Sequence, residues 1–384
     1  MLNAFEFWTN SKIYFQPGSI KKLGEETKAL RGRKVLLVTD KGVKNSGVLA
    51  KAIESLEREG LSHAVFDEVE PNPSAETTQK GYALMKEKGC DTLAAVGGGS
   101  PIDTAKAIGI QATNPEPILK YEGANKVTNP LPPLIAIPTT AGTGSEVTGA
   151  AVITDTTRKY KVPMRSPLLI PRVALLDPEV LATLPPLVLA STGMDALTHA
   201  CETFVSTMTN PLSQGLAYES IRLIGKYLRP LYANPDNREA QGYMMLASTM
   251  AGMAFFNGRL GAVHTLAHPL GGFFDIPHGI ANAILLPHCM EFSRIGAPDL
   301  FARIAEALGR DIRGLTVEEA SRQAAEAVRE ILVDTRIPTR LREVGAKKVA
   351  FEAMAKDGIA SGIHLSNPRR VTLEDAIALY EAAF

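Results

Sequence analysis

A histidine-rich segment near the middle of the C-terminal half restricts how this chain can fold. Residues 261–279, GAVHTLAHPLGGFFDIPHG, hold three of the chain's seven histidines. His264 and His268 are four residues apart and would share one face of a helix. Pro269 and the pair Gly271-Gly272 should then break that helix, and His278 stands at the start of the next apolar run. A helix, a glycine turn and a second helix start would direct imidazoles toward one place.

A complementary pair lies upstream in residues 191–199, STGMDALTH. Asp195 and His199 are again four residues apart, on an otherwise apolar helix. Buried carboxylates and imidazoles are costly unless they are paired or bind a metal. One aspartate and three histidines offer one oxygen and three nitrogen donors, which suits Fe²⁺ or Zn²⁺. The pattern predicts a divalent metal site, and the alternative is two ordinary helices whose polar residues are satisfied locally.

Composition excludes several classes of protein. Lys+Arg and Asp+Glu are equal at 41 each, so no basic excess favours nucleic acid or an anionic membrane. Cys90, Cys201 and Cys289 are far apart and form no CxxC pair, which argues against a disulfide framework and fits a reducing compartment. The start of the chain lacks a signal-peptide pattern, and no apolar run reaches the roughly 18 residues of a membrane span. We therefore expect a soluble, cytoplasmic protein without nucleic-acid or membrane partners.

The first half alternates between strand and helix patterns, and the second half does not. Expected strands cover residues 34–40, 64–69, 91–96, 134–137 and 173–177, with a short hairpin at 152–153 and 159–162. Expected helices cover residues 47–59 and 77–88. Alternation of this kind predicts a Rossmann-like α/β domain with a parallel sheet. After Pro185-Pro186 only helical patterning remains, so we expect an α/β domain over 1–185 and an all-helical domain over 186–384.

The stretch GGGSPIDTAKAIG follows an expected strand and resembles a phosphate loop. Gly97, Gly98 and Gly99 allow the backbone to approach an anion closely, Ser100 is a good N-cap, and Pro101 suits the first helical position. Free N–H groups and the positive end of the helix dipole would then face a pyrophosphate. The segment is not the GxGxxG fingerprint, and a tight strand–helix turn is the alternative.

A second polar turn follows the strand at 134–137. PTTAGTGSEVT crowds Thr139, Thr140, Thr143 and Ser145 around two glycines, and small hydroxyls on a flexible backbone suit hydrogen bonding to a dinucleotide. Asp40 ends the first expected strand of the alternating region, where an adenine ribose would lie. Its carboxylate would accept from ribose hydroxyls and repel a 2′-phosphate, which favours NAD over NADP. A simple strand-end turn is the other reading of Asp40.

Four motifs, in the right order along essentially the whole chain, closely resemble the iron-containing (group III) alcohol dehydrogenases. They are GGGSPIDTAKAIG, PTTAGTGSEVT, GMDALTHA and GAVHTLAHPLGG…PHG, and the ending SNPRRVTLEDAIALYEAAF agrees. Within that family, the chain is similar to members of the lactaldehyde reductase and 1,3-propanediol dehydrogenase type.

The resemblance implies a set of site residues. The metal ligands would be Asp195, His199, His264 and His278, and His268 would sit beside the metal without binding it. Because oxidation of an alcohol releases a proton, we expect His268 to relay that proton. A role in orienting a ligand, or in capping the break at Pro269, is the alternative for His268. The resemblance also places Asp103 at the cofactor, Asn72 near the adenosine and Lys161 near a ribose. Helix-dipole or turn chemistry alone would also account for Asp103 and Asn72.

The predicted reaction is hydride transfer between NAD and a short neutral primary alcohol or diol and its aldehyde, aided by Fe²⁺ or Zn²⁺ as a Lewis acid. A polyanionic substrate would need several cations, and Arg259 is the only Lys or Arg between Met244 and Gly279. One alternative is a metal- and NAD-dependent lyase or cyclase like dehydroquinate synthase. Another is a non-catalytic nucleotide-binding protein with a structural metal. Residues 12–16 alternate like an edge strand, and the resemblance implies a homo-oligomer, preferably a dimer.

Overall fold

The computed structural model describes residues 4–158 and 160–384. The chain divides into two compact units, one of which comprises Trp8–Leu184. The other comprises Pro185–Phe384 together with residues 4–7. Among the described residues no helix is long and apolar enough to cross a membrane.

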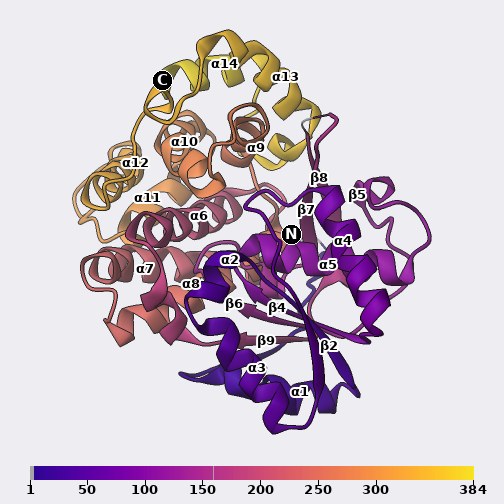
Figure 1. Cartoon of the computed structure of the whole chain (residues 1–384). Helices are drawn as coiled ribbons and strands as arrows, with labels where there is room; N and C mark the ends of the chain where they lie inside the picture. Colours follow the sequence, from indigo (N-terminus) through magenta and orange to yellow (C-terminus); the bar gives the residue numbers. More distant parts are fainter. Residues whose placement is uncertain (1–3, 159) are drawn as a thin grey trace. The chain divides into compact units, whose positions relative to one another are not determined.

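A six-stranded sheet, parallel throughout, forms the centre of the first unit (Figure 1). The strand order is β1-β9-β6-β4-β2-β3. The strands are β1 (Lys12–Phe15), β2 (Lys34–Val38), β3 (Ser62–Phe66), β4 (Thr92–Gly97), β6 (Leu134–Pro138) and β9 (Val173–Leu176). Each strand expected for the sheet is present, and residues 12–16 supply the edge strand β1. The predicted parallel α/β fold is confirmed.

Short helices between the strands cover both faces of this sheet. They are α1 (Leu23–Ala29), α2 (Lys41–Asn45), α3 (Val48–Arg58), α4 (Ala75–Lys88) and α5 (Gly99–Thr113). Right-handed crossovers place α1 and α3 on one face and α4 and α5 on the other, because the direction of strand addition reverses after β3 (Figure 1). The strand ends of β2 and β4 therefore flank the topological switch point, where open α/β sheets bind ligands.

A small second sheet, ordered β5-β8-β7, completes the first unit. β7 (Ala150–Asp155) and β8 (Tyr160–Arg165) pair antiparallel, which confirms the predicted hairpin, and β5 (Gly123–Ala124) adds a short parallel strand. The expected range 159–162 began at Lys159, which lies outside the described residues.

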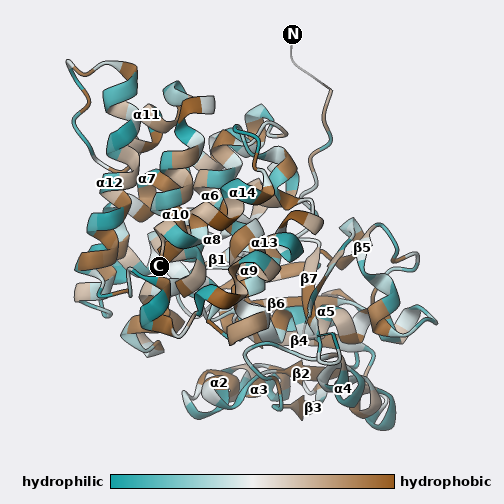
Figure 2. Ribbon diagram, turned by 90° about the horizontal axis from the view of Figure 1, so that it is seen from above, coloured by the Kyte–Doolittle hydropathy of each residue, from teal (hydrophilic) through white to brown (hydrophobic). Residues whose placement is uncertain are grey.

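The second unit is built from helices, and residues 185–384, all of them described, include no strand. The helices are α6 (Pro186–Val205), α7 (Pro211–Ala233), α8 (Arg238–Gly258), α9 (Ala262–Phe274), α10 (His278–Ser293), α11 (Pro298–Ala307), α12 (Val317–Asp334), α13 (Phe351–Ala360) and α14 (Leu373–Ala382). In Figure 2 the peripheral helix α12 alternates between hydrophilic and hydrophobic colours, as an amphipathic helix does. Asp195 and His264, by contrast, belong to helix segments that are buried almost throughout.

The expectation that Pro269 and Gly271-Gly272 break the helix is wrong. α9 continues through all three residues to Phe274 and ends where Asp275 takes a left-handed conformation with φ 53°. Pro269 cannot donate to the carbonyl of Thr265, one turn earlier. That carbonyl is covered by α13, because a Cβ at Gly358 would lie 2.5 Å from the Thr265 oxygen. The proline and both glycines therefore lie within α9, and the segment of α9 around Thr265 packs closely against α13.

The helix start assigned to the phosphate loop is also wrong by two residues. α5 begins at Gly99 with Gly98 as its N-cap, and Pro101 is the third helical residue. The hydroxyl of Ser100 instead donates to the carbonyl of Pro71 at 2.7 Å. The cap position therefore has no side chain, which leaves the backbone at the start of α5 unobstructed by a capping group.

Candidate metal centre

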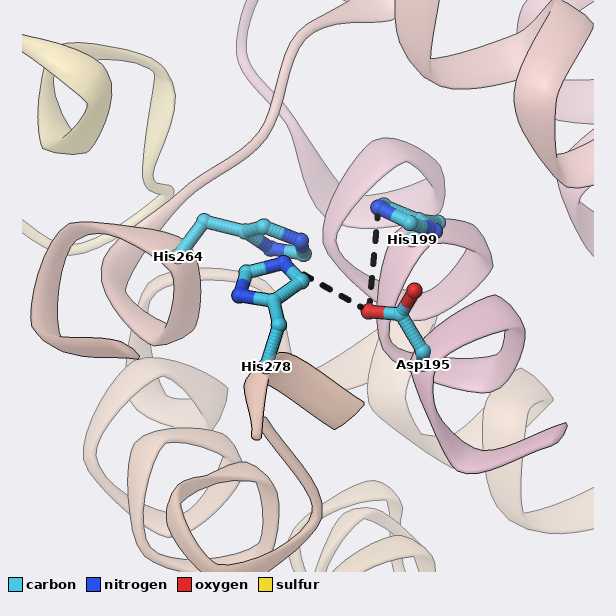
Figure 3. A group of neighbouring side chains, drawn as sticks. All are labelled: Asp195, His199, His264 and His278. Carbon is cyan, nitrogen blue, oxygen red and sulfur yellow. Dashed lines mark ion pairs between the residues drawn. The ribbon is translucent and has the colours of Figure 1, made fainter. Parts of the chain in front are cut away.

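Asp195, His199, His264 and His278 converge in the helical unit (Figure 3). Each offers one ligand atom, and these four atoms all lie within 4.8 Å of one another. Oδ1 of Asp195 lies 3.9 Å from Nε2 of His199 and 3.6 Å from Nε2 of His278. Asp195 and His199 both come from α6, where their spacing of four residues puts them on the same helix face. α9 and α10 supply the other two.

Aromatic stacking fixes the orientation of the imidazoles. The ring of His199 stacks between Phe255, at a centroid distance of 4.4 Å, and His264, at 4.7 Å. Asp195, His199 and His264 are at most 4% exposed, while the side chain of His278 is 28% exposed. Three of the four groups are therefore enclosed, and the fourth faces the accessible side of the cluster.

His268 borders the cluster but lies outside the group of four. Its ring centroid is 5.3 Å from that of His278 and 6.0 Å from that of His264, and the residue is half-buried. One turn of α9 separates it from His264, as the i, i+4 spacing predicts. The position lets His268 face the same space as His278.

Glu202 is a buried carboxylate that the sequence reasoning did not single out. Its Oε2 lies 2.5 Å from Nδ1 of His264, and its Oε1 accepts from the backbone N–H of Val263 at 2.6 Å. The available signal was its position on α6, seven residues after Asp195 and therefore on the same helix face.

Asn282 was also missed and lies inside the cluster. Its Nδ2 is 2.6 Å from Oδ1 of Asp195, 3.2 Å from Nε2 of His264 and 3.1 Å from Nε2 of His278. The signal here was again helical spacing, since Asn282 follows His278 by four residues in α10.

These residues fit a divalent ion. One carboxylate and three imidazoles present acceptor atoms to one point, and such a group needs an electropositive partner. The amide of Asn282 has only two hydrogens for three neighbouring acceptors, so it satisfies them incompletely. The donor set suits Fe²⁺ and Zn²⁺ equally.

The two glycine-rich motifs of the first unit lie against each other at the carboxyl ends of β4 and β6. Gly97 is opposite Pro138 in the parallel pair, and the N–H of Thr139 donates to the Gly97 carbonyl at 3.0 Å. A Cβ at Gly98 would lie 3.1 Å from Oγ1 of Thr140, and one at Gly99 would lie 2.8 Å from Cγ2 of Thr143. A side chain at either position would crowd these threonines, so glycine favours this close packing, besides any role in approaching a phosphate.

Asp103 and Ser145 form a buried network with Lys106. Ser145 Oγ donates to Asp103 Oδ1 at 2.6 Å, and the N–H of Val152 donates to Asp103 Oδ2 at 2.9 Å. Lys106 donates to Oγ and to the carbonyl of Ser145 at 2.7 and 2.8 Å. Burial raises the pKa of Asp103, against the opposing effect of Lys106, and lowers the pKa of Lys106 to about 8. These contacts connect α5 to the second glycine-rich turn. They give Asp103 and Ser145 a structural role.

The other candidate cofactor residues lie at separate places in the first unit. Asp40 caps α2, its Oδ1 accepting from the N–H of Val43 at 2.9 Å. The carbonyl of Asn72 accepts from Thr154 Oγ1 at 3.4 Å. Lys161 lies in β8, where its charge opposes the rise that burial causes in the pKa of Asp103. Asp40 therefore has the turn role that was its alternative reading, with its carboxylate still at the carboxyl end of β2.

Comparisons with known proteins agree along the whole length. A family model described as iron-containing alcohol dehydrogenase matches residues 10–178, and one described as Fe-containing alcohol dehydrogenase family, C-terminal, matches residues 189–384. Lactaldehyde reductase of Escherichia coli (strain K12) is 40% identical over 98% of each chain. NAD-dependent methanol dehydrogenase of Bacillus methanolicus is 38% identical over 95% of this chain and 96% of that protein.

A solved structure extends the agreement to the fold. The crystal structure of a 1,3-propanediol oxidoreductase covers 100% of both chains at 42% identity, with a TM-score of 0.97. Both halves of the chain thus match one family, and the resemblance found in the four sequence motifs is confirmed. The chain belongs to the iron-containing alcohol dehydrogenase family.

Proposed function

We propose that the protein is a metal-dependent, NAD(H)-linked dehydrogenase that interconverts short neutral primary alcohols or diols and their aldehydes. The observation that carries this proposal is the convergence of Asp195, His199, His264 and His278 in a member of this family. The three imidazoles and the carboxylate would hold Fe²⁺, with Zn²⁺ as the alternative.

The bound ion would supply Lewis-acid polarisation of an alcohol or carbonyl oxygen, and NAD(H) would supply the hydride acceptor or donor. The chain supplies orientation and proton transfer. Phe255 covers one face of His199 and keeps that side of the cluster apolar. Oxidation of an alcohol releases a proton as well as a hydride, and His268, which is half-buried beside His278, would carry that proton away from the cluster.

The nucleotide would bind at the carboxyl ends of β2, β4 and β6. The first turn of an α-helix has N–H groups without intrahelical acceptors, and the positive end of the dipole adds to their attraction for phosphate. α5 presents such a turn directly after Gly97 and Gly98. Asp40, at the neighbouring strand end, would contact the adenine ribose and favour NAD over NADP. Asn72, Thr139, Thr140, Thr143 and Lys161 remain candidates for direct contact, and Asp103 and Ser145 for support of the loops.

Residues near the cluster favour a small neutral substrate. Phe255 stacks on His199, and Arg259 is the only Lys or Arg between Met244 and Gly279. Recognition of a polyanion would require several such cations. The three relatives described above are named for methanol, lactaldehyde and 1,3-propanediol, which are short and uncharged.

The decisive experiment is NADH formation by the Fe²⁺-loaded protein from a panel of simple alcohols and diols. We expect sustained turnover with at least one primary alcohol, loss of turnover after chelation, and recovery on adding Fe²⁺. A lyase or cyclase resembling dehydroquinate synthase would regenerate its NAD and give no net NADH. A nucleotide-binding protein with a structural metal would bind NAD without turnover, so either result would overturn the proposal.

We also propose that the protein is a cytoplasmic homodimer. The strand β1 ends the sheet, and its residues Ile13 and Phe15 are 38% and 40% exposed, so pairing with a second copy would cover them. The three cysteines are thiols, which suits a reducing compartment. Sedimentation should give twice the mass of the chain, and a concentration-independent monomer would refute the dimer. Recovery of the protein outside the cytoplasmic fraction of its own cells would refute the location.

A further inference from the structure

We propose that Glu202 is a positioning residue for the metal ion, acting through the imidazole of His264. The proposal rests on the metal site proposed above. The carboxylate of Glu202 would hold the hydrogen of His264 on Nδ1 and thereby keep Nε2 available to the ion.

The contacts of His264 show which ring nitrogen carries the hydrogen and which presents its lone pair to the cluster. Nδ1 lies 2.5 Å from Oε2 of Glu202, and the opposite nitrogen, Nε2, lies 3.2 Å from Nδ2 of Asn282 inside the cluster. A carboxylate accepts a hydrogen bond only from a protonated nitrogen, so a neutral His264 must carry its hydrogen on Nδ1. Nε2 then has its lone pair directed into the cluster. Partners of this kind fix the tautomer and ring orientation of metal-binding histidines and increase their basicity.

The start of α9 explains how a carboxylate can be buried here. Glu202 is 6% exposed, and Oε1 accepts from the N–H of Val263, the second residue of α9. Asn367 Oδ1 accepts from the N–H of the first residue, Ala262, at 3.3 Å. Both acceptors come from other parts of the chain, and the positive end of the α9 dipole adds a favourable interaction with the Glu202 charge.

Gly261 makes room for these two acceptors. As the N-cap of α9 it has no capping side chain. A Cβ there would lie 2.9 Å from Asn367 Oδ1 and 3.2 Å from Glu202 Oε1. The short spacing between Gly261 and His264 thus lets one carboxylate both cap the helix and hold the imidazole three residues later.

Variants of Glu202 and Asn367, the two acceptors at the start of α9, distinguish a helix cap from a positioning residue. Only loss of a positioning residue should lower the affinity for metal. In Glu202→Gln the side chain keeps its shape but has one acceptor oxygen, so it cannot accept from both Val263 N–H and His264 Nδ1–H. We expect the apparent affinity for Co²⁺ or Zn²⁺, measured by chelator competition, to fall about 10–100-fold. Asn367→Ala is the matched control, because it removes an acceptor from the same helix end without touching His264. It should lower apo-protein stability while leaving metal affinity within about threefold of wild type.

A spectroscopic readout separates the two roles without relying on turnover. In the Co²⁺-substituted protein, solvent-exchangeable imidazole N–H resonances report the tautomer of each coordinated histidine. We expect the resonance of His264 to shift or exchange rapidly in Glu202→Gln and to stay unchanged in Asn367→Ala. If Glu202→Gln does not fold, Glu202→Asp supplies the same comparison, because its shorter side chain keeps the charge but cannot reach both donors.

Three outcomes would overturn the proposal. Wild-type metal affinity and N–H resonances in the Glu202 variant would make Glu202 a helix cap only. An equal loss of affinity in Asn367→Ala would assign the effect to the stability of α9. A wild-type protein that binds no divalent metal would overturn the metal site as well, so failure of the proposed site is distinguishable from failure of the role of Glu202.

Discussion

The amide nitrogen of Asn282 lies 2.6 Å from Oδ1 of Asp195, and the two residues belong to different helices, α10 and α6. Asn282 is fully buried, so this hydrogen bond is shielded from water. Its Oδ1 is buried without a hydrogen-bond partner in the described structure. An amide held with one end unsatisfied is consistent with a role in directing the Asp195 carboxylate.

Replacing Asn282 should therefore weaken metal binding. Asn282→Leu keeps the branched shape of the side chain but cannot donate to Asp195, and we expect the apparent metal affinity to fall roughly tenfold or more. Ser293→Ala, on the same helix but outside the cluster, should bind metal as wild type. Chelator competition measures both, and equal affinities for wild type and Asn282→Leu would show that the contact with Asp195 is dispensable.

Removal of either of two metal ligands should abolish stoichiometric metal. His199 and His278 come from α6 and α10, so His199→Ala and His278→Ala test the contribution of each helix separately. Metal content per chain, measured by elemental analysis, should fall well below that of wild type in both. His288→Ala, on α10 but outside the group of four, serves as the control. Unchanged metal content in both ligand variants would refute the assignment.

His268→Ala should keep its metal and lose turnover. The usual contribution of a general acid–base group predicts a loss of about 10²–10⁴-fold in kcat. The loss should shrink as pH rises, because hydroxide can take the proton in place of the imidazole. His63→Ala, in β3, controls for the loss of a histidine as such. A His268 variant that loses its metal, or turns over normally across the pH range, would make the residue structural.

Asp40 should determine the choice between NAD and NADP. Asp40→Gly removes the carboxylate and should shift the ratio of kcat/KM for the two cofactors toward NADP. It also removes the cap of α2, so Asp40→Asn is the sharper variant, because asparagine keeps an acceptor for the N–H of Val43 and loses only the charge. Both variants should accept NADP better than wild type. An unchanged ratio in both would leave Asp40 with its capping role alone.

Lys106 should make stability rise with pH in the alkaline range. Burial lowers its pKa from 10.5 to about 8 in the folded chain. Between these values the unfolded chain holds a proton that the folded chain has released, so this group's contribution to the free energy of unfolding increases with pH. At about 1.4 kcal/mol per pKa unit, wild type should gain roughly 1–2 kcal/mol relative to Lys106→Met between pH 8 and pH 9.5. Urea unfolding at both pH values measures this difference, which should be absent if folded Lys106 stays protonated with a pKa near 10.5.

Local patterns were sufficient for much of the fold and for part of the site. The alternation of apolar strands and amphipathic helices predicted the parallel sheet, because the two periods of 2.0 and 3.6 residues are properties of the backbone itself. The i, i+4 spacing of Asp195 and His199 placed both on one face of α6 for the same reason. The histidine pattern of residues 261–279 predicted that imidazoles from this segment complete the site, and the family resemblance selected His264 and His278 as the ligands.

Tertiary contacts decided what local patterns could not. Pro269 lies inside α9, which packs closely against α13 at Thr265 and Gly358, and nothing in the sequence around Pro269 indicates that contact. The cap of α5 is Gly98, because Ser100 is engaged by Pro71, which lies 29 residues away. Glu202 and Asn282 reach His264 across 62 and 18 residues. The energy of such contacts depends on distances between elements, and those distances exist only once the helices have packed.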